Sequence, residues 1–219
     1  MLALILSALS VPGLTEAQWA VVEACPRISV PRGAVGAGVV VGVRDGFAYV
    51  LTAAHVVKFD GVELAFTSRR SYPKPAWFAP EPEVVNRWPE PDLALIRFRV
   101  PEGRKVGPVP LAGVGERPKE YPARLWAVGG GGREASWARG ELIQRKRCVR
   151  RPGGGLVFFW ESDSPPEPGD SGGPLLDSRG RVVGVCSASA DGRGYYTHFD
   201  EVLVTLKRSD QSWLIIKRP

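Results

Sequence analysis

The sequence predicts an all-β protein with one short helix close to its C-terminus. The chain has 219 residues, of which 26 are glycine and 20 are proline, and these residues interrupt helices and form turns. Its apolar runs are short, rich in Val, Ile, Phe, Tyr or Trp, and bounded by Gly, Pro, Asp or Asn, as strands are. A hydrophobic content of 44% with 24% charged residues is ordinary for a folded globular protein.

The strand-like runs fall into two halves. The first half ends near Val100, a Pro- and Gly-rich connecting segment follows, and the second half resumes near Ala123. Helical periodicity is convincing only in residues 200–209, where Val202, Leu203 and Leu206 share one face. The predicted strands are residues 35–43, 47–57, 62–67, 93–100, 124–128, 141–149, 156–160, 181–187 and 195–199.

The N-terminus has the pattern of a secretory signal peptide, which we predict over residues 1–17. An apolar run too short to span a membrane precedes Pro12, and small and polar residues follow it, so that a cut after Ala17 is expected. The run lacks the usual Lys or Arg. The alternatives are a buried N-terminal segment and a lipid-modified Cys25, which Glu23 disfavours. We expect residues 18–219 to be secreted or periplasmic and not to remain inserted in a membrane.

The chain is basic, with a net charge of +6 and a pI of about 9.5. The densest basic run, residues 144–151, has no interleaved aromatic residues and belongs to no recognisable nucleic-acid module, so we interpret it as a solvated hairpin face. The alternative is a site for nucleic acid or another polyanion, which salt-sensitive binding to heparin through this run would indicate.

Metal, cofactor and disulfide chemistry have little support in the sequence. The chain has two histidines and no Cys-x-x-Cys spacing, so we expect no metal site and no cofactor. Its cysteines are Cys25, Cys148 and Cys186, of which only one pair can form within the chain, and the sequence does not choose among the three pairings.

The segment "PEPGDSGGPLLD" carries the strongest sign of chemistry. Glycines at 169, 172 and 173 surround Ser171 and permit backbone conformations that other side chains forbid. Such a turn can aim the backbone amides of Gly169 and Ser171 at one point, as an oxyanion hole requires. A glycine-rich β-turn without catalytic function explains the glycines equally well, so Ser171 needs a base and an acid elsewhere in the chain.

His55 and Asp92 are the candidate partners of Ser171. His55 follows a hydrophobic strand that ends in small residues, whereas no local feature marks His198. Asp92 opens a strongly apolar strand, while Asp45 and Asp60 each precede a glycine, so that a turn accounts for them. A histidine that acts as a base needs an acceptor on its second ring nitrogen, and Asp92 is the candidate for it.

The segments "LTAAH", "DLALIRF" and "GDSGGPLL", in this order, resemble the trypsin-like (chymotrypsin-fold) serine proteases over residues 33–206. With "GAGVVV" and "GRVVGV", the chain is most similar to bacterial peptidases related to the HtrA proteases. The resemblance implies two six-stranded antiparallel β-barrels over residues 18–110 and 111–219, with the active site between them. His55, Asp92 and Ser171 would be catalytic, with the oxyanion hole at Gly169 and Ser171.

The resemblance also implies a substrate site. Ser187 and Ser189 match the strand that pairs with the substrate backbone, and Gly194 matches the back wall of the specificity pocket. Pro165 stands where trypsin has the aspartate that selects Arg or Lys. We therefore expect a small or medium apolar residue before the scissile bond, with Glu167 or Asp191 as a second route to basic specificity.

Several departures from the family bear on activation. Val56 stands where trypsin has a cysteine. In animal relatives a new Ile or Val N-terminus pairs with the aspartate that Asp170 matches, but Arg27-Ile28 is too close to Gly36 for such a cut, so we expect no activation of that kind. The HtrA proteases carry a C-terminal PDZ domain, and we expect none after the barrels here. We predict a serine endopeptidase acting on protein or peptide substrates, with no nucleic-acid partner; the alternative is a catalytically silent homologue that acts as a binding or scaffold protein.

Overall fold

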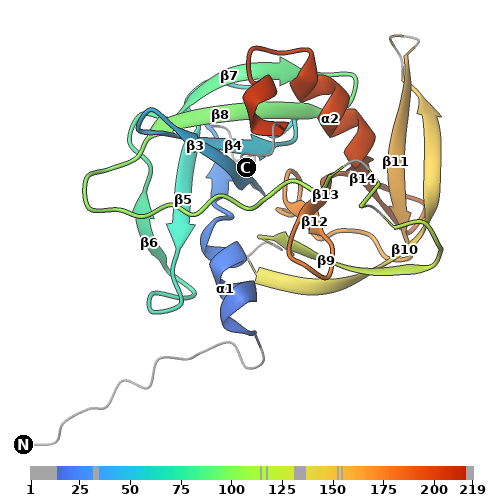
Figure 1. Cartoon of the computed structure of the whole chain (residues 1–219), viewed down its shortest axis with the longest axis horizontal. Helices are drawn as coiled ribbons and strands as arrows, with labels where there is room; N and C mark the ends of the chain where they lie inside the picture. The colour runs from blue at the N-terminus through green and yellow to red at the C-terminus, as the bar shows by residue number, and fades with distance from the viewer. Residues whose placement is uncertain are drawn as a thin grey trace, which may run out of the picture.

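The computed structural model describes residues 14–31, 35–113, 115–116, 118–130, 137–151, 153 and 155–215. Most of the predicted signal segment, residues 1–13, lies outside the described residues. The chain is rich in strands and forms two halves, whose strands lie left and right in Figure 1 (blue to green, and yellow to orange). The predicted all-β class with a C-terminal helix is confirmed.

The N-terminal half consists of two four-stranded antiparallel sheets with the orders β2-β1-β5-β6 and β3-β4-β8-β7. Asp45 and Gly46 form the β3–β4 turn with φ values of 51° and 78°, as the Asp-Gly signal predicts. The strands are β1 (Arg27–Ser29), β2 (Val35–Ala37), β3 (Val39–Arg44), β4 (Phe47–Thr52), β5 (Glu63–Thr67), β6 (Pro75–Phe78), β7 (Glu83–Trp88) and β8 (Leu93–Arg99).

The six-stranded barrel that the resemblance implies for the first half stays a prediction, because the described strands of this half form two four-stranded sheets. The chain passes from one sheet to the other at Gly38, where β2 ends and β3 begins. A Cβ atom at Gly38 would lie 2.6 Å from Val50 Cγ1, and the Gly38 amide donates to the Pro26 carbonyl (3.1 Å) in the register of the β1–β2 pairing. A glycine thus lets one strand run divide between two sheets.

The C-terminal half is a closed six-stranded antiparallel barrel, as expected, with the order β10-β11-β14-β13-β12-β9. The short strand β12 closes it, because Leu175 pairs with Ala127 on one side and Gly184 on the other. The division between the halves at residue 110 stays a prediction, although Leu111 already bridges to Val182 of the barrel. The strands are β9 (Ala123–Gly129), β10 (Trp137–Arg150), β11 (Leu156–Ser162), β12 (Pro174–Leu176), β13 (Val182–Ala190) and β14 (Arg193–His198).

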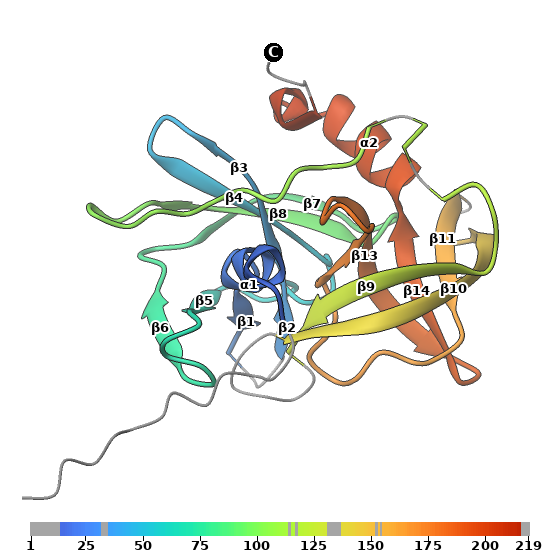
Figure 2. The same cartoon turned by 60° about the horizontal axis from the view of Figure 1, so that its bottom comes forward.

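Two α-helices pack on this framework. The helix α1 (Glu16–Glu23) buries Trp19 and Val22 and touches strands of both halves (Figure 2). The predicted cut after Ala17 falls inside this helix, whose capping box joins Thr15 and Gln18. The helix α2 (Phe199–Lys207) matches the predicted C-terminal helix, buries Val202 and Leu206, and is followed by the 3-10 turn η1 (Ser212–Ile215). Within the described ranges, we find no helix with the length and apolar character needed to cross a bilayer.

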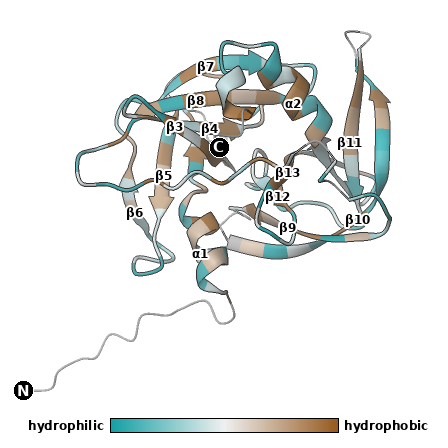
Figure 3. Cartoon of the chain, in the orientation of Figure 1, coloured by the Kyte–Doolittle hydropathy of each residue, from teal (hydrophilic) through white to brown (hydrophobic). Residues whose placement is uncertain are grey.

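The central strands are mostly apolar (Figure 3) because they are buried over most of their length, as in β4 and β8. Val50 and Ile96 are fully buried in the first half, and Val183 is fully buried in the second. Cys25 and Cys186 are buried, Cys148 is exposed, and none of the three is paired. Burial raises the pKa of the Cys25 and Cys186 thiols, so both stay protonated near neutral pH.

Candidate active site

His55 and Asp92 meet at the edge of one sheet. His55 lies just after β4 and Asp92 just before β8, and these strands are antiparallel neighbours with Thr52 opposite Ala94. The end of β4 therefore lies beside the start of β8. The His55 Nδ1–Asp92 Oδ2 distance is 2.8 Å, and the His55 backbone amide donates to Asp92 Oδ1 at 3.0 Å. The expected pairing of the two residues agrees with this geometry.

Asp92 is buried and receives a third hydrogen bond from across the molecule. Its side chain is 9% exposed, and Ser187 Oγ on β13 donates to Oδ2 at 2.6 Å. The Asp92 backbone has φ 54°, a left-handed conformation that Asp tolerates better than most residues. With a carboxylate accepting at Nδ1, the neutral His55 ring carries its proton there, so that Nε2 is left as the basic nitrogen. The His55 side chain is 45% exposed, which leaves its outer edge open to a substrate.

Ser171 lies in a turn that begins at Glu167. The Asp170 amide donates to the Glu167 carbonyl (3.0 Å), and the Gly173 amide donates to the Asp170 carbonyl (2.9 Å). Gly169 and Gly172 have φ values of 96° and 84°, which confirms that the glycines are needed for the backbone path. In the part of the chain that the structure describes, neither the Gly169 nor the Ser171 amide donates a hydrogen bond, so both are available to an incoming oxyanion.

The Ser171 turn packs directly against the segment that carries His55. The Ala37 amide donates to the Ser171 carbonyl at 2.8 Å. A Cβ atom at Gly36 would lie 2.7 Å from both that carbonyl oxygen and Val56 Cγ1, the side chain next to His55 in sequence. Among the described residues, no hydrogen bond joins Ser171 Oγ to the His55 ring. Catalytic hydrogen bonds of this type often tighten only when substrate binds.

The strand expected to bind the substrate has an open edge. β14 covers one side of β13, with Gly194 opposite Ser189, whereas the pairing with β12 on the other side stops at Val185. Ser189 is exposed, while Ser187 is buried because its side chain turns inward to Asp92. An uncovered strand edge beside the Ser171 turn can pair with an extended peptide.

The residues of the predicted specificity pocket leave little free space around Gly194. Pro165 is exposed on the loop before Ser171. At Gly194 a Cβ atom would lie 2.7 Å from the Ser164 carbonyl oxygen and 3.0 Å from Pro166 Cδ, so a larger residue does not fit. The Glu167 side chain is exposed on the same loop, and Asp191 occupies the β13–β14 hairpin turn with φ 51°. Their roles in specificity stay predictions.

The second histidine has a structural position. His198 is fully buried, its ring centroid is 3.9 Å from that of Trp160, and its Nδ1 accepts from the Asp200 amide (3.0 Å) as the N-cap of α2. This position accounts for His198 without a catalytic role. The sequence gives no hint of it, because histidine is an unusual N-cap residue.

The basic run of residues 144–151 lies on β10 and at its end, and acidic residues neutralise part of it. Arg145 and Arg147 both pair with Glu161, and Lys146 pairs with Asp200 at 3.1 Å. These contacts agree with the interpretation as a hairpin face.

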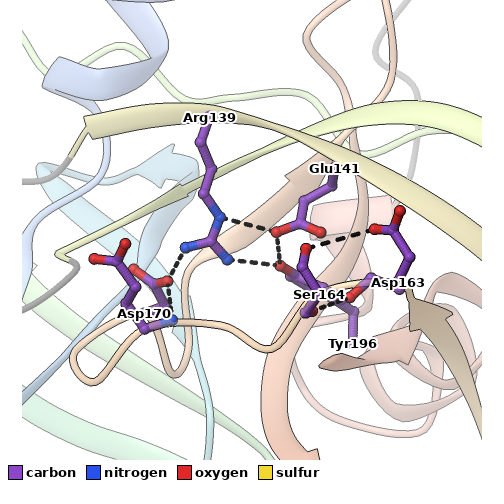
Figure 4. A network of polar contacts seen from close by, with 8 residues as sticks. Arg139, Glu141, Asp163, Ser164, Asp170 and Tyr196 are labelled. Carbon is purple, nitrogen blue, oxygen red and sulfur yellow. Dashed lines mark hydrogen bonds and ion pairs between the residues drawn. The ribbon is translucent and has the colours of Figure 1, made fainter. Parts of the chain in front are cut away.

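One residue that sequence reasoning missed lies behind the Ser171 turn. Arg139 of β10 forms an ion pair with Asp170, the residue before Ser171, and also contacts Glu141 and Tyr196 (Figure 4). In the sequence Arg139 is one of 29 basic residues, and nothing local distinguishes it.

Comparison with known families shows which protein family contains this arrangement of residues. The family model described as a trypsin-like peptidase domain matches residues 36–185. The chain belongs to this family. Its match covers the segments of His55, Asp92 and Ser171, and the predicted relationship to trypsin-like, HtrA-related peptidases is confirmed.

Individual relatives agree with this assignment. A DegP-like periplasmic serine endoprotease of Marinomonas sp. (strain MWYL1) is 29% identical over 160 residues, covering 71% of this chain and 30% of that protein. Protease Do-like 5, chloroplastic, of Arabidopsis thaliana is 30% identical over 119 residues, covering 53% of this chain and 36% of that protein. The chain thus spans about a third of the length of these relatives. The crystal structure of the Rv3671c protease from M. tuberculosis in its active form shares the fold, with a TM-score of 0.69 and 23% identity over 93% of this chain and 86% of that chain.

Proposed function

We propose that the chain is a serine endopeptidase in which Ser171 is the nucleophile, His55 the general base and Asp92 the residue that orients the base. The observation that carries this proposal is the His55–Asp92 pair at 2.8 Å beside a glycine-rich turn whose Gly169 and Ser171 amides are not used internally. A scaffold protein has no physical need for this combination.

The reaction follows from the positions of these groups. Ser171 Oγ attacks the peptide carbonyl carbon while His55 Nε2 takes its proton, and the Gly169 and Ser171 amides stabilise the developing oxyanion. The charged imidazolium is stabilised by Asp92 and then donates its proton to the leaving amine. Water, deprotonated by His55, hydrolyses the acyl-enzyme and restores Ser171. Substrate would lie along the open edge of β13 at Ser187–Ala190, in extended conformation.

Fluorophosphonate labelling tests the assignment of the nucleophile. We expect wild-type protein to be labelled and the Ser171→Ala variant to be unlabelled with an unchanged melting temperature. His55→Ala should slow labelling by several orders of magnitude, whereas His198→Asn, which retains a capping side chain, should be labelled at the wild-type rate if it folds. Labelling of folded Ser171→Ala protein would overturn the proposal.

A casein-type assay distinguishes an enzyme from a silent homologue. Equal background-level hydrolysis by wild type and by His55→Ala, both folded, would favour the scaffold alternative.

We also propose that the protein is exported. The apolar pattern of residues 1–17 and the periplasmic assignment of the Marinomonas relative support this. Because Thr15 caps α1, a cut that preserves the helix would fall before Thr15. N-terminal sequencing of the protein recovered from the periplasm tests the site, and recovery of the uncut chain from the cytoplasm alone would contradict export.

A further inference from the structure

Asp170 is the buried acid of the Ser171 turn. Its side chain is 3% exposed, and Oδ2 accepts from the Glu167 amide at 2.8 Å. Its own amide and carbonyl hold the two ends of the turn, at Glu167 and Gly173. The position of this one residue therefore sets the backbone path through Gly169 and Ser171, the two residues whose amides would form the oxyanion hole.

Arg139 reaches Asp170 from the adjacent barrel wall. Its Nη1 pairs with Asp170 Oδ2, its Nε binds Glu141 Oε1 at 2.8 Å, and its Nη2 donates to the Tyr196 hydroxyl at 3.1 Å (Figure 4). Tyr196 in turn donates to Glu141 Oε1 at 3.0 Å. The planar guanidinium is thus fixed on three edges by groups from β10, β14 and the turn. Its side chain is 16% exposed; burial opposes the charge, but Tyr196, Asp170 and Glu141 outweigh it and raise the pKa of Arg139.

The end of β9 leaves little freedom for the turn. A Cβ atom at Gly129 would lie 2.7 Å from Asp170 Cγ and 2.9 Å from its Cα. The next residue, Gly130, donates its amide to the Gly169 carbonyl at 3.2 Å. The cation on one side and the glycine backbone on the other confine Asp170 to one position.

A new chain terminus at Ile28 is not placed for the same task. The one candidate cut would free the Ile28 amine, but Ile28 is fully buried in β1, between Gly36 of β2 and Leu64 of β5. Ile28 would have to leave the interior of a sheet to approach Asp170. The cation that Asp170 requires is instead part of the barrel.

We propose that Arg139 is the positioning residue of the oxyanion hole: through Asp170 it holds the Gly169–Ser171 turn in its active arrangement, so that activity needs no cut between Arg27 and Ile28. Glu141 and Tyr196 orient Arg139 for this role. The inference rests on the proposed peptidase function.

The test compares three variants with wild type by their rate of fluorophosphonate labelling, their kcat and KM on a peptide substrate, and their melting temperature. Arg139→Met should be labelled about 100-fold more slowly, with kcat reduced in proportion and KM nearly unchanged, as expected when oxyanion stabilisation is lost. Arg181→Met is the matched control, because Arg181 is also 16% exposed and pairs with Asp177 and Glu116 of the same half. It should be labelled at the wild-type rate even if its melting temperature falls.

Arg139→Met leaves Asp170 and Glu141 as buried charges without their cation and can fail to fold for that reason alone. The variant Arg139→Met/Glu141→Gln/Asp170→Asn removes all three charges and retains the shapes of the side chains. We expect it to fold and still to be labelled at least tenfold more slowly than wild type, because the turn has lost its ionic tether. A purely structural role for Arg139 predicts the wild-type rate in this variant.

The two proposals fail in different ways. Folded wild-type protein that is not labelled overturns the peptidase function itself. Labelled wild type, with folded Arg139 variants labelled equally fast, overturns only the role of Arg139. Wild-type activity that appears only after a cut between Arg27 and Ile28 also overturns it.

Discussion

Asp92 and Asp170 are both buried aspartates beside the Ser171 segment, yet the first is held by neutral or titratable donors and the second by a permanent cation. Asp92 accepts from the His55 ring, the His55 amide and Ser187 Oγ. Asp170 is paired with Arg139. In the proposed mechanism, a permanent cation on Asp92 would weaken its attraction for the imidazolium that forms on His55, whereas a cation on Asp170 neutralises an aspartate that holds the turn and has no proposed part in proton transfer.

The difference shows how the two sides of the site are built. The His55–Asp92 side needs a free negative charge, so its geometry comes from hydrogen bonds at the adjoining ends of β4 and β8. The Ser171 side needs a fixed backbone, so its geometry comes from an ion pair between a turn and the wall of the barrel. Substitutions at Asp92, Gly129 and Ser187 each change one side and leave the other intact.

Removing the charge of Asp92 should have the largest effect. Asp92→Asn should lower kcat by about 10⁴-fold, because an amide no longer enforces the Nδ1–H form of His55 or stabilises the imidazolium. Asp170→Asn should lower kcat far less, since the amide oxygen can still accept from the Glu167 backbone. Steady-state kinetics on a peptide ester measure both. Equal losses in the two folded variants would remove the distinction between a catalytic and an anchoring aspartate.

Placing an extra methyl group against Asp170 should have an intermediate effect on the labelling rate. Gly129→Ala places a methyl group against Asp170, so we expect about tenfold slower labelling and a loss of stability of about 2 kcal/mol from overpacking. Gly140→Ala on β10 is the control, because a Cβ atom there meets nothing within 4 Å. The labelling rates and melting temperatures of the two glycine variants test this expectation. An undisturbed Gly129→Ala variant would mean that the turn has more freedom than its contacts indicate.

Removing one of the three donors to Asp92 should have a smaller effect. Ser187→Ala should lower kcat by roughly tenfold or less and destabilise the fold by about 1 kcal/mol, the usual net value of one hydrogen bond. Ser209→Ala, which removes a hydroxyl bonded to the Leu206 carbonyl at the end of α2, should affect stability alone. If Ser187→Ala kinetics match wild type, the other two donors suffice to hold Asp92.

The reactivity of the cysteines should show how well the core excludes reagents, without any effect on catalysis. In native protein only Cys148 should react with iodoacetamide near neutral pH, since burial shields Cys25 and Cys186 and raises their pKa values, which keeps them as thiols below those values. All three should react after unfolding in denaturant. Mass spectrometry counts the adducts, and rapid modification of Cys186 in native protein would indicate that the barrel opens beside the Ser171 turn.

The sequence was sufficient for the catalytic candidates because their signals are local. A strand that ends in small residues marks His55, an acid that opens an apolar strand marks Asp92, and glycines mark the turn of Ser171. The all-β class and α2 could be predicted for the same reason, since short apolar runs and one helical period are visible within a few residues.

The features that the sequence did not reveal depend on contacts between distant residues or on competing interpretations. Arg139 acquires its meaning only when barrel closure brings β10, β14 and the Asp170 turn together. The capping box of Thr15 and Gln18 is present in the sequence, but the apolar run before it favoured a signal peptide over a helix at residues 16–23. The division of the first half at Gly38 depends on the space beside Val50, which no periodicity indicates.

The most direct test of the central claim is to locate the fluorophosphonate adduct by peptide mapping of the wild-type protein. The account predicts one adduct per chain, on the peptide that contains Ser171, and its loss in the folded His55→Ala variant. A folded wild-type protein that carries no adduct, or carries it on another residue, would contradict the account.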